Sequence, residues 1–206
     1  MARELTLVDA RLDNLSSVRR ALVQVGASVH VTSDPDEIAK ASALILPGQG
    51  TLCEATDALV KGPIGEAIKL VIQRGDPFLG ISVGMQLLFD CSHENPKHEG
   101  FHVMKGQIHS FPRDMSVKEN GQPRRLKLPH CGWNDVSPAG DHYYFSHRHY
   151  VQASDASDLL WSCHYGSVNF AAAVRRDNIY GCQFHPEKSQ KMGLRFLRTF
   201  VLGSRS

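Results

Sequence analysis

The stretch Pro77-Phe78-Leu79-Gly80-Ile81-Ser82-Val83-Gly84 runs from an apolar segment into the pattern G-x-S-x-G. This pattern is typical of a nucleophile elbow, in which a strand ends in a tight turn that holds one side chain above the N-terminus of a helix. Glycines at positions 80 and 84 permit the strained turn and the close packing that would expose Ser82. The backbone N–H of Val83, at the start of the following helix, is then a natural donor for an oxyanion.

Strands and helices alternate on the N-terminal side of this stretch. We expect strands over Leu5–Val8, Ala27–Val31, Leu44–Leu46 and Pro77–Ile81, and amphipathic helices over 15–22, 34–40 and Ile64–Ile72. Asp34 is expected to cap the second helix, with Pro35 at its first helical position. This alternation predicts an α/β fold with a doubly wound, mostly parallel sheet. Ligands of such sheets bind at the carboxyl ends of the strands, where Pro47–Gly50 and Gly80–Gly84 lie.

The pattern changes in the C-terminal half of the chain. We expect shorter strands there, separated by polar turns, and a last amphipathic helix over Ser189–Phe200. The expected strands cover His102–Ser110, Arg124–Leu128, Tyr143–Val151 and Phe170–Arg175. Their mixed character indicates antiparallel additions to the sheet. No linker or repeat divides the chain, so we expect residues 1–206 to form a single domain.

Composition excludes several classes of function. A formal net charge of +2 is too small to indicate a nucleic-acid-binding protein, and no apolar run approaches the ~20 residues that cross a bilayer. The N-terminus lacks the apolar core of a secretory signal. Five scattered cysteines without a C-x-x-C pair favour reduced thiols in a cytoplasmic protein. His142, His147 and His149 have only Asp141 as a nearby carboxylate, so we expect no metal site.

A serine nucleophile needs a base, a group that orients the base, and oxyanion donors. His185 is the best base in the sequence, because Pro186 stiffens the turn after it and Glu187 lies two residues away. Considered without the elbow, His185 could equally be interpreted as a core histidine whose hydrogen bonds are satisfied. A serine esterase is disfavoured, because the acid follows the histidine immediately and no HGGG-like oxyanion motif is present.

Two segments together resemble a known family. Gly80–Gln86 is similar to the elbow of class I, triad-type glutamine amidotransferases, which carry cysteine where this chain has Ser82, and Gln183–Ser189 matches the segment that supplies their histidine and glutamate. Four further pieces resemble the glutaminase subunits of imidazole glycerol phosphate synthases. They are Val8-Asp9 with Asn14–Val18, Leu46–Gly50, Leu128–Asn134 and Tyr144–His147. The six matches occur in the family's order and cover nearly the whole chain.

The resemblance implies a flavodoxin-like sheet and an attack on the side-chain amide of L-glutamine. The ammonia released would pass to a cyclase subunit with a (β/α)₈ barrel, in a heterodimer, and no cofactor is implied. By position, Ser82 is the nucleophile, His185 the acid and base, and Glu187 the group that orients His185. The strand Gly48–Gly50 would present the second oxyanion donor, the N–H of Gln49. The expected glutamine contacts are Gln86, His147 and Arg148. The residues that match the cyclase-facing surface are Asn14, Trp133 and Lys188.

The sequence departs from the family's pattern at three places. Gln49 stands where the family has a small apolar residue, and we expect this to alter the flip of the oxyanion strand. Arg148-His149 replaces Ser/Thr-Tyr after the loop histidine, which changes the expected side-chain contacts with glutamine. Ser82 is the largest departure, because a hydroxyl is far less acidic than a thiol of pKa near ~8.5. We expect a loss of about 10³-fold or more. We interpret Ser82 as a deliberate Cys→Ser substitution of the kind that traps substrate, or else as the mark of a natural ammonia-dependent relative.

Two other interpretations stay open. A paralogous amidotransferase could deliver ammonia to a different acceptor, such as a sugar. A non-catalytic scaffold could instead activate or stabilise a cyclase, although such a protein has no chemical need for His185 and Glu187.

Overall fold

The computed structural model of the protein describes residues 4–9, 15–48, 55–56, 59–92, 95–119 and 121–203. Its central sheet has seven strands in the order β13-β14-β15-β4-β3-β1-β2. Five of them, from β15 to β2, run parallel, whereas β14 and β13 are added antiparallel at one edge. The strands are β1 Glu4–Val8, β2 Ser28–Thr32, β3 Leu44–Leu46, β4 Phe78–Ile81, β13 Leu159–Tyr165, β14 Val168–Arg176 and β15 Ile179–Cys182. The predicted α/β fold, mostly parallel with antiparallel additions, is confirmed.

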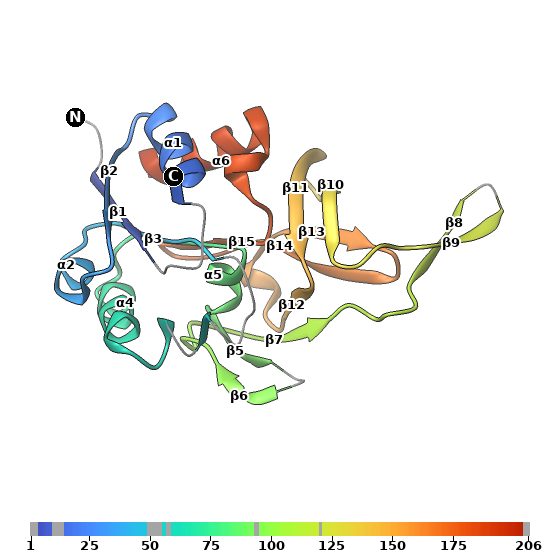
Figure 1. Ribbon diagram of the computed structural model, residues 1–206, viewed down its shortest axis with the longest axis horizontal. Coiled ribbons are helices and arrows are strands. Elements are labelled where there is room, and N and C mark those ends of the chain that lie inside the picture. The colour runs from blue at the N-terminus through green and yellow to red at the C-terminus, as the bar shows by residue number, and fades with distance from the viewer. Residues whose placement is uncertain are drawn as a thin grey trace.

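Helices cover both faces of this sheet. Figure 1 shows α1 (Leu15–Gln24) and α6 (Gln190–Leu202) above the sheet, and α2 (Pro35–Ala39) and α4 (Pro63–Gln73) below it. Consecutive residues of a strand point to opposite faces. On β3, Ile45 therefore packs in the core cluster under α1 and α6, whereas Leu44 and Leu46 pack in the cluster against α2 and α4. Burial on both faces explains why the inner strands β3 and β4 are continuous runs without a charged or polar side chain.

Local signals set the ends of the N-terminal helices as expected. The Asp34 side chain accepts a hydrogen bond from the backbone N–H of Asp36 at 2.8 Å, and Pro35 opens α2. Pro63 opens α4 in the same way. None of the helices in the described ranges combines the length and the apolar character that a membrane span requires.

Smaller sheets and hairpins extend the C-terminal half. One four-stranded sheet has the order β12-β7-β5-β6, and β10–β11 and β8–β9 form two separate two-stranded sheets. The bounds are β5 Phe89–Ser92, β6 Asn95–Glu99, β7 Met104–Ser110, β8 Ser116–Glu119, β9 Gln122–Arg125, β10 His130–Val136, β11 Asp141–His147 and β12 His149–Ala153. Short helical turns follow the elbow (α5, Val83–Gln86) and occur at η1 (Ala156–Asp158) and η2 (Pro186–Lys188).

Two strand predictions in this half are wrong. The run Tyr143–Val151 is not one strand, because His147 pairs with β10 whereas His149 pairs with Ser110 of β7, so the chain changes sheets at Arg148. The run Arg124–Leu128 ends as a strand at Arg125. The strand β10 was not predicted, because its alternation is broken by Gly132 and its pairing with β11 is set by residues farther along the chain.

Candidate active site

Ser82 occupies a strained turn between β4 and α5. Its backbone has φ 56° and ψ −111°, a conformation that residues with a Cβ rarely adopt. The glycines on either side permit the turn to pack closely. A Cβ at Gly80 would lie 2.4 Å from the Gly84 carbonyl oxygen, and one at Gly84 would lie 2.0 Å from that of Leu46. The predicted nucleophile elbow is therefore present.

Ser82 itself is less accessible than expected from the motif. Only 2% of the residue is exposed, although the turn was expected to present it openly. Its N–H donates to the carbonyl of Cys182 at 2.7 Å, which ties the turn to the end of β15. Because β4 and β15 pair in parallel, with Ile81 opposite Cys182, the residues that follow both strands emerge at the same edge of the sheet. This edge brings the elbow and the segment that contains His185 together.

His185 and Glu187 form a buried pair at that edge. Nδ1 of His185 lies 2.9 Å from Oε1 of Glu187, and the two side chains are only 3% and 2% exposed. A carboxylate accepts, so Nδ1 carries the proton and Nε2 is free to accept one from a nucleophile. The turn η2 sets the pair, because the Lys188 N–H donates to the His185 carbonyl at 3.0 Å. The hydroxyl of Ser189 donates to the same carbonyl at 2.7 Å and accepts from the Tyr144 N–H.

The thiol of Cys182, at the end of β15, is not activated as a nucleophile. Cys182 lies directly before the Gln183–Ser189 segment and is completely buried. Burial raises the pKa of its thiol well above the ordinary value, and the charge of Glu187 acts in the same direction. A thiol of raised pKa is a poor nucleophile at neutral pH, so Cys182 is a poor candidate for a nucleophile at this edge.

The expected oxyanion donor is already engaged. The N–H of Val83 points to the carbonyl oxygen of Gly48 at 3.4 Å. An oxyanion cannot share this position with a carbonyl oxygen, because both are acceptors. Gly48 packs tightly here, since a Cβ on it would lie 2.7 Å from the Val83 side chain. Gln49 and Gly50, predicted to complete the strand, lie outside the described residues.

Two of the three predicted glutamine contacts converge, and the third does not join them. Nε2 of Gln86 donates to the carbonyl of His149 at 3.1 Å, and Nδ1 of His147 reaches the same carbonyl at 2.7 Å. Both side chains are buried. Arg148 is exposed at the corner between β11 and β12, where it lines a cavity of about 500 Å³ with Arg113 and His149.

The two described residues of the predicted partner surface gather around Tyr144. Trp133 is 47% exposed and meets the Tyr144 ring edge-on at 6.1 Å. The ammonium of Lys188 lies over the same ring at 5.9 Å. Asn14, the third residue predicted there, lies outside the described part of the chain. Tyr144 was not predicted, although it belongs to a segment that carried the family resemblance.

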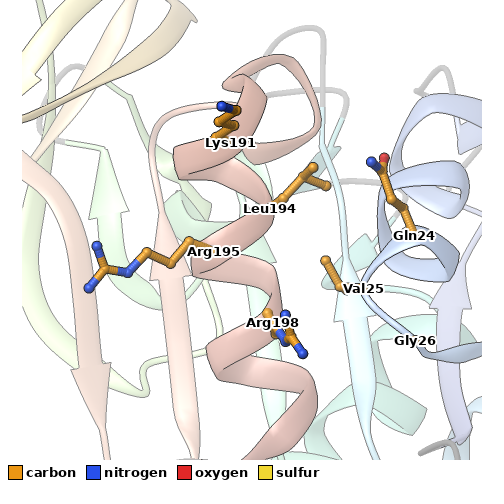
Figure 2. A pocket seen from close by; sticks show the side chains of 7 residues that line it. All are labelled: Gln24, Val25, Gly26, Lys191, Leu194, Arg195 and Arg198. Carbon is orange, nitrogen blue, oxygen red and sulfur yellow. The ribbon is translucent and has the colours of Figure 1, made fainter.

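One large cavity lies away from the elbow and the His–Glu pair. It has a volume of about 530 Å³ and lies between the C-terminus of α1 and the helix α6 (Figure 2). Its lining does not include Ser82, His185 or Glu187. The residues that line it are Gln24, Val25, Gly26, Lys191, Leu194, Arg195 and Arg198. An adjacent cavity of about 310 Å³ reaches Glu187. Within the described ranges, no three His, Cys, Asp or Glu side chains gather as metal ligands would.

Comparisons with known proteins agree with this geometry. The model of the family "Glutamine amidotransferase class-I" matches residues 6–203. Proteins named imidazole glycerol phosphate synthase subunit HisH are similar throughout. The Salinibacter ruber protein is 41% identical over 95% of this chain and 93% of its own length, and the Syntrophotalea carbinolica protein is 42% identical over 95% and 98%.

Solved structures share the fold at low sequence identity. The PurLQS structure from Thermotoga maritima superposes with a TM-score of 0.71 at 16% identity, covering 98% of this chain and 100% of that one. A crystal structure of a glutamine amidotransferase gives a TM-score of 0.70, also at 16% identity, over 95% of this chain and 97% of that one. With its elbow, its buried His–Glu pair and the match over residues 6–203, this chain belongs to the class-I glutamine amidotransferase family.

Proposed function

We propose that this chain is the glutaminase subunit of an imidazole glycerol phosphate synthase, with an impaired nucleophile. The observation that carries the proposal is the buried His185–Glu187 pair, 2.9 Å apart, at the sheet edge where the elbow of Ser82 ends. The names of relatives about 40% identical to this chain support the assignment to this synthase over other acceptors of ammonia. The substrate would be L-glutamine.

The roles of the three residues follow from the proton positions. Glu187 holds the Nδ1–H of His185, which leaves Nε2 to take the proton of the nucleophile at position 82 as it attacks the carboxamide carbon of glutamine. The same proton then passes to the leaving nitrogen, which departs as ammonia and leaves a γ-glutamyl enzyme. A water molecule, deprotonated by His185, hydrolyses this ester or thioester and releases glutamate.

Ser82 slows this cycle at its first step. A serine hydroxyl loses its proton only as it attacks, and its oxygen is smaller than the sulfur for which the family's site is shaped. We therefore expect turnover to be about 10³-fold or more below that of the cysteine form.

A change of backbone conformation belongs to the same proposal. The Val83 N–H becomes available for the oxyanion when the Gly48 carbonyl, 3.4 Å away, turns from it. Rotation of the peptide between Gly48 and Gln49 would remove this acceptor and supply the N–H of Gln49 as the second donor. Gly48, Gly50, Gln86 and Arg148 keep the proposed contacts with glutamine. His147 lies beside them without a direct contact in this proposal, because both its ring nitrogens already have protein partners.

The partner is a cyclase subunit with a (β/α)₈ barrel, which would dock as a heterodimer over Asn14, Trp133 and Lys188. The exposed indole of Trp133 supports this placement, because large aromatic side chains are enriched at protein interfaces. A cytoplasmic location is part of the proposal. The free thiols of Cys131, Cys163 and Cys182 support it.

Restoring the nucleophile tests the proposal. Ser82→Cys and the unchanged protein are assayed for glutamate release, each with and without a cognate cyclase and its nucleotide ligand. We expect rapid release only from the Ser82→Cys complex, and Ser82→Cys with Glu187→Gln serves as the matched control that lacks the orienting carboxylate. Rapid hydrolysis by isolated Ser82→Cys would contradict the dependence on the partner. Inactivity of the Ser82→Cys complex would favour a non-catalytic scaffold.

A further inference from the structure

Two buried histidines lie side by side in the aromatic core next to the elbow. His130 of β10 and His147 of β11 are direct cross-strand neighbours, and they are 3% and 6% exposed. His130 stacks between the rings of Tyr165 at 4.0 Å and Phe145 at 5.0 Å, and Phe170 meets both histidines edge-on. A polar ring in such a place is costly unless each nitrogen has a partner.

The partners of the two rings define a single direction of hydrogen bonding. Nδ1 of His147 lies 2.7 Å from the carbonyl oxygen of His149, which can only accept, so Nδ1 carries the proton. Nε2 of neutral His147 is then an acceptor. It lies 2.9 Å from Nδ1 of His130, which must donate to it. This leaves Nε2 of His130 as an acceptor in turn.

Asn134 supplies the donor at the far end. Its amide nitrogen lies 3.3 Å from Nε2 of His130 and donates to the carbonyl of His164 at 2.8 Å. Because the His164 carbonyl only accepts, the amide of Asn134 cannot be reversed without losing that bond. The donors therefore run in one direction, from Asn134 through His130 and His147 to the His149 carbonyl. Asn134 is half-buried on β10, so this series of hydrogen bonds begins close to the surface.

The His149 carbonyl, where this series of hydrogen bonds ends, also accepts a hydrogen bond from a residue of α5. The His149 carbonyl accepts from Nε2 of Gln86 at 3.1 Å, and the same amide nitrogen donates to Oε1 of Gln183 at 2.9 Å. Both protons of the Gln86 amide are thereby committed. Its oxygen is left as the atom that can accept from another molecule. The backbone N–H of Gln86 donates to the backbone carbonyl of Ser82 at 3.2 Å, so Gln86 follows Ser82 by one helical turn.

We propose that His130 and His147 are positioning residues, which form a one-way hydrogen-bond relay that orients the Gln86 amide with its oxygen available to an N–H donor of glutamine. The inference rests on the proposed function, in which Gln86 contacts glutamine. Burial lowers the pKa of His130 to about 4 and that of His147 to about 3, so both rings are neutral at pH 7, as the relay requires. Protonation of His147 would turn Nε2 into a donor and force His130 to present an N–H to the Asn134 amide.

The first experiment examines the relay in the free protein, without glutamine or a partner. Two-bond ¹H–¹⁵N spectra identify which ring nitrogen carries the proton, and we expect Nδ1–H on both histidines. We also expect the side-chain amide protons of Gln86 to exchange more rapidly in His130→Phe, which cannot donate to His147. His130→Asn should restore slow exchange, because the asparagine amide can place a donor where Nδ1 stood. An Nε2–H tautomer on either histidine would overturn the proposal.

The second experiment measures L-glutamine binding by calorimetry to the protein as it stands, in complex with the cyclase. We expect His130→Phe to weaken binding about tenfold, the factor that corresponds to ~1.4 kcal/mol, and His130→Asn to recover most of it. Phe170→Leu is the matched control, because it loosens the packing against both histidines and leaves every bond of the relay in place. If Phe170→Leu weakens glutamine binding as much as His130→Phe does, or if His130→Phe does not weaken it, the two histidines serve only in core packing and the proposal is refuted. If the unchanged complex binds no glutamine, the proposed function fails, and the relay is decided by the spectra alone.

Discussion

Acidification provides a quantitative test of how the two core histidines contribute to stability. The pKa of His130 lies at about 4 and that of His147 at about 3, because burial disfavours the charged imidazolium. In the unfolded chain both titrate near ~6.5. Below this pH the unfolded chain therefore binds more protons than the folded protein does. The stability that the neutral pair preserves is fully present above pH ~6.5 and is lost progressively on acidification.

The magnitude at pH 5 follows from the unfolded chain alone. Both folded pKa values lie below 5, so the native rings stay neutral there, whereas the unfolded rings are almost fully protonated. Each histidine then favours unfolding by ~1.36 × 1.5, or about 2 kcal/mol, and the pair by about 4 kcal/mol. This is a large share of the ~5–15 kcal/mol by which folded domains are stable.

Urea unfolding at pH 7.5, 6 and 5 measures this loss, and the variant His130→Phe/His147→Phe isolates it from the other titrating groups. We expect the free energy of unfolding of the unchanged protein to fall by about 4 kcal/mol more than that of the double variant between pH 7.5 and 5. Because only the difference between two slopes is used, a change in absolute stability of the variant does not affect the test. Parallel pH dependences of the two proteins would refute the assignment of neutral, buried histidines.

Two further predictions concern packing and charge elsewhere. Gly84→Ala should lower the free energy of unfolding by about 3 kcal/mol or more, and the melting temperature sharply, because its Cβ would lie 2.0 Å from a backbone oxygen. The control Gly75→Ala, with φ 77° and open space around it, should lose only ~1 kcal/mol, and equal losses would contradict the close packing of the elbow. Arg176→Met should lower the free energy of unfolding, measured by chemical denaturation, by about 3 kcal/mol, because it leaves the buried carboxylate of Asp158 without its guanidinium partner at 2.8 Å. The double variant Arg176→Met/Asp158→Leu should recover most of this loss, and a double variant no more stable than Arg176→Met would refute the explanation.

The parts of the site that could be predicted are those whose geometry is local in the chain. The elbow could be recognised from residues 80–84 alone, because two glycines around one residue at the end of an apolar run are typical of this turn. The pairing of His185 with Glu187 likewise spans two residues within one turn. The parallel direction of the inner strands was expected from the alternation of strands with helices, and ligands of such sheets bind at the carboxyl ends of the strands. The strand β15, which brings His185 to the elbow, was not predicted.

The parts that could not be predicted depend on pairings between distant segments. The boundary at Arg148, the bond from Val83 to the Gly48 carbonyl and the contact between Gln86 and His149 each depend on backbone positions that are set elsewhere in the chain.

Short-range patterns and motifs were enough to predict the fold class, the family and the residues of the His–Glu pair. The burial of Ser82, the acceptor in front of the Val83 N–H and the directed hydrogen bonds from His130 and His147 toward Gln86 became visible only in the folded protein. Burial and the direction of a hydrogen bond depend on surroundings that strand register and packing create, and no single segment contains them.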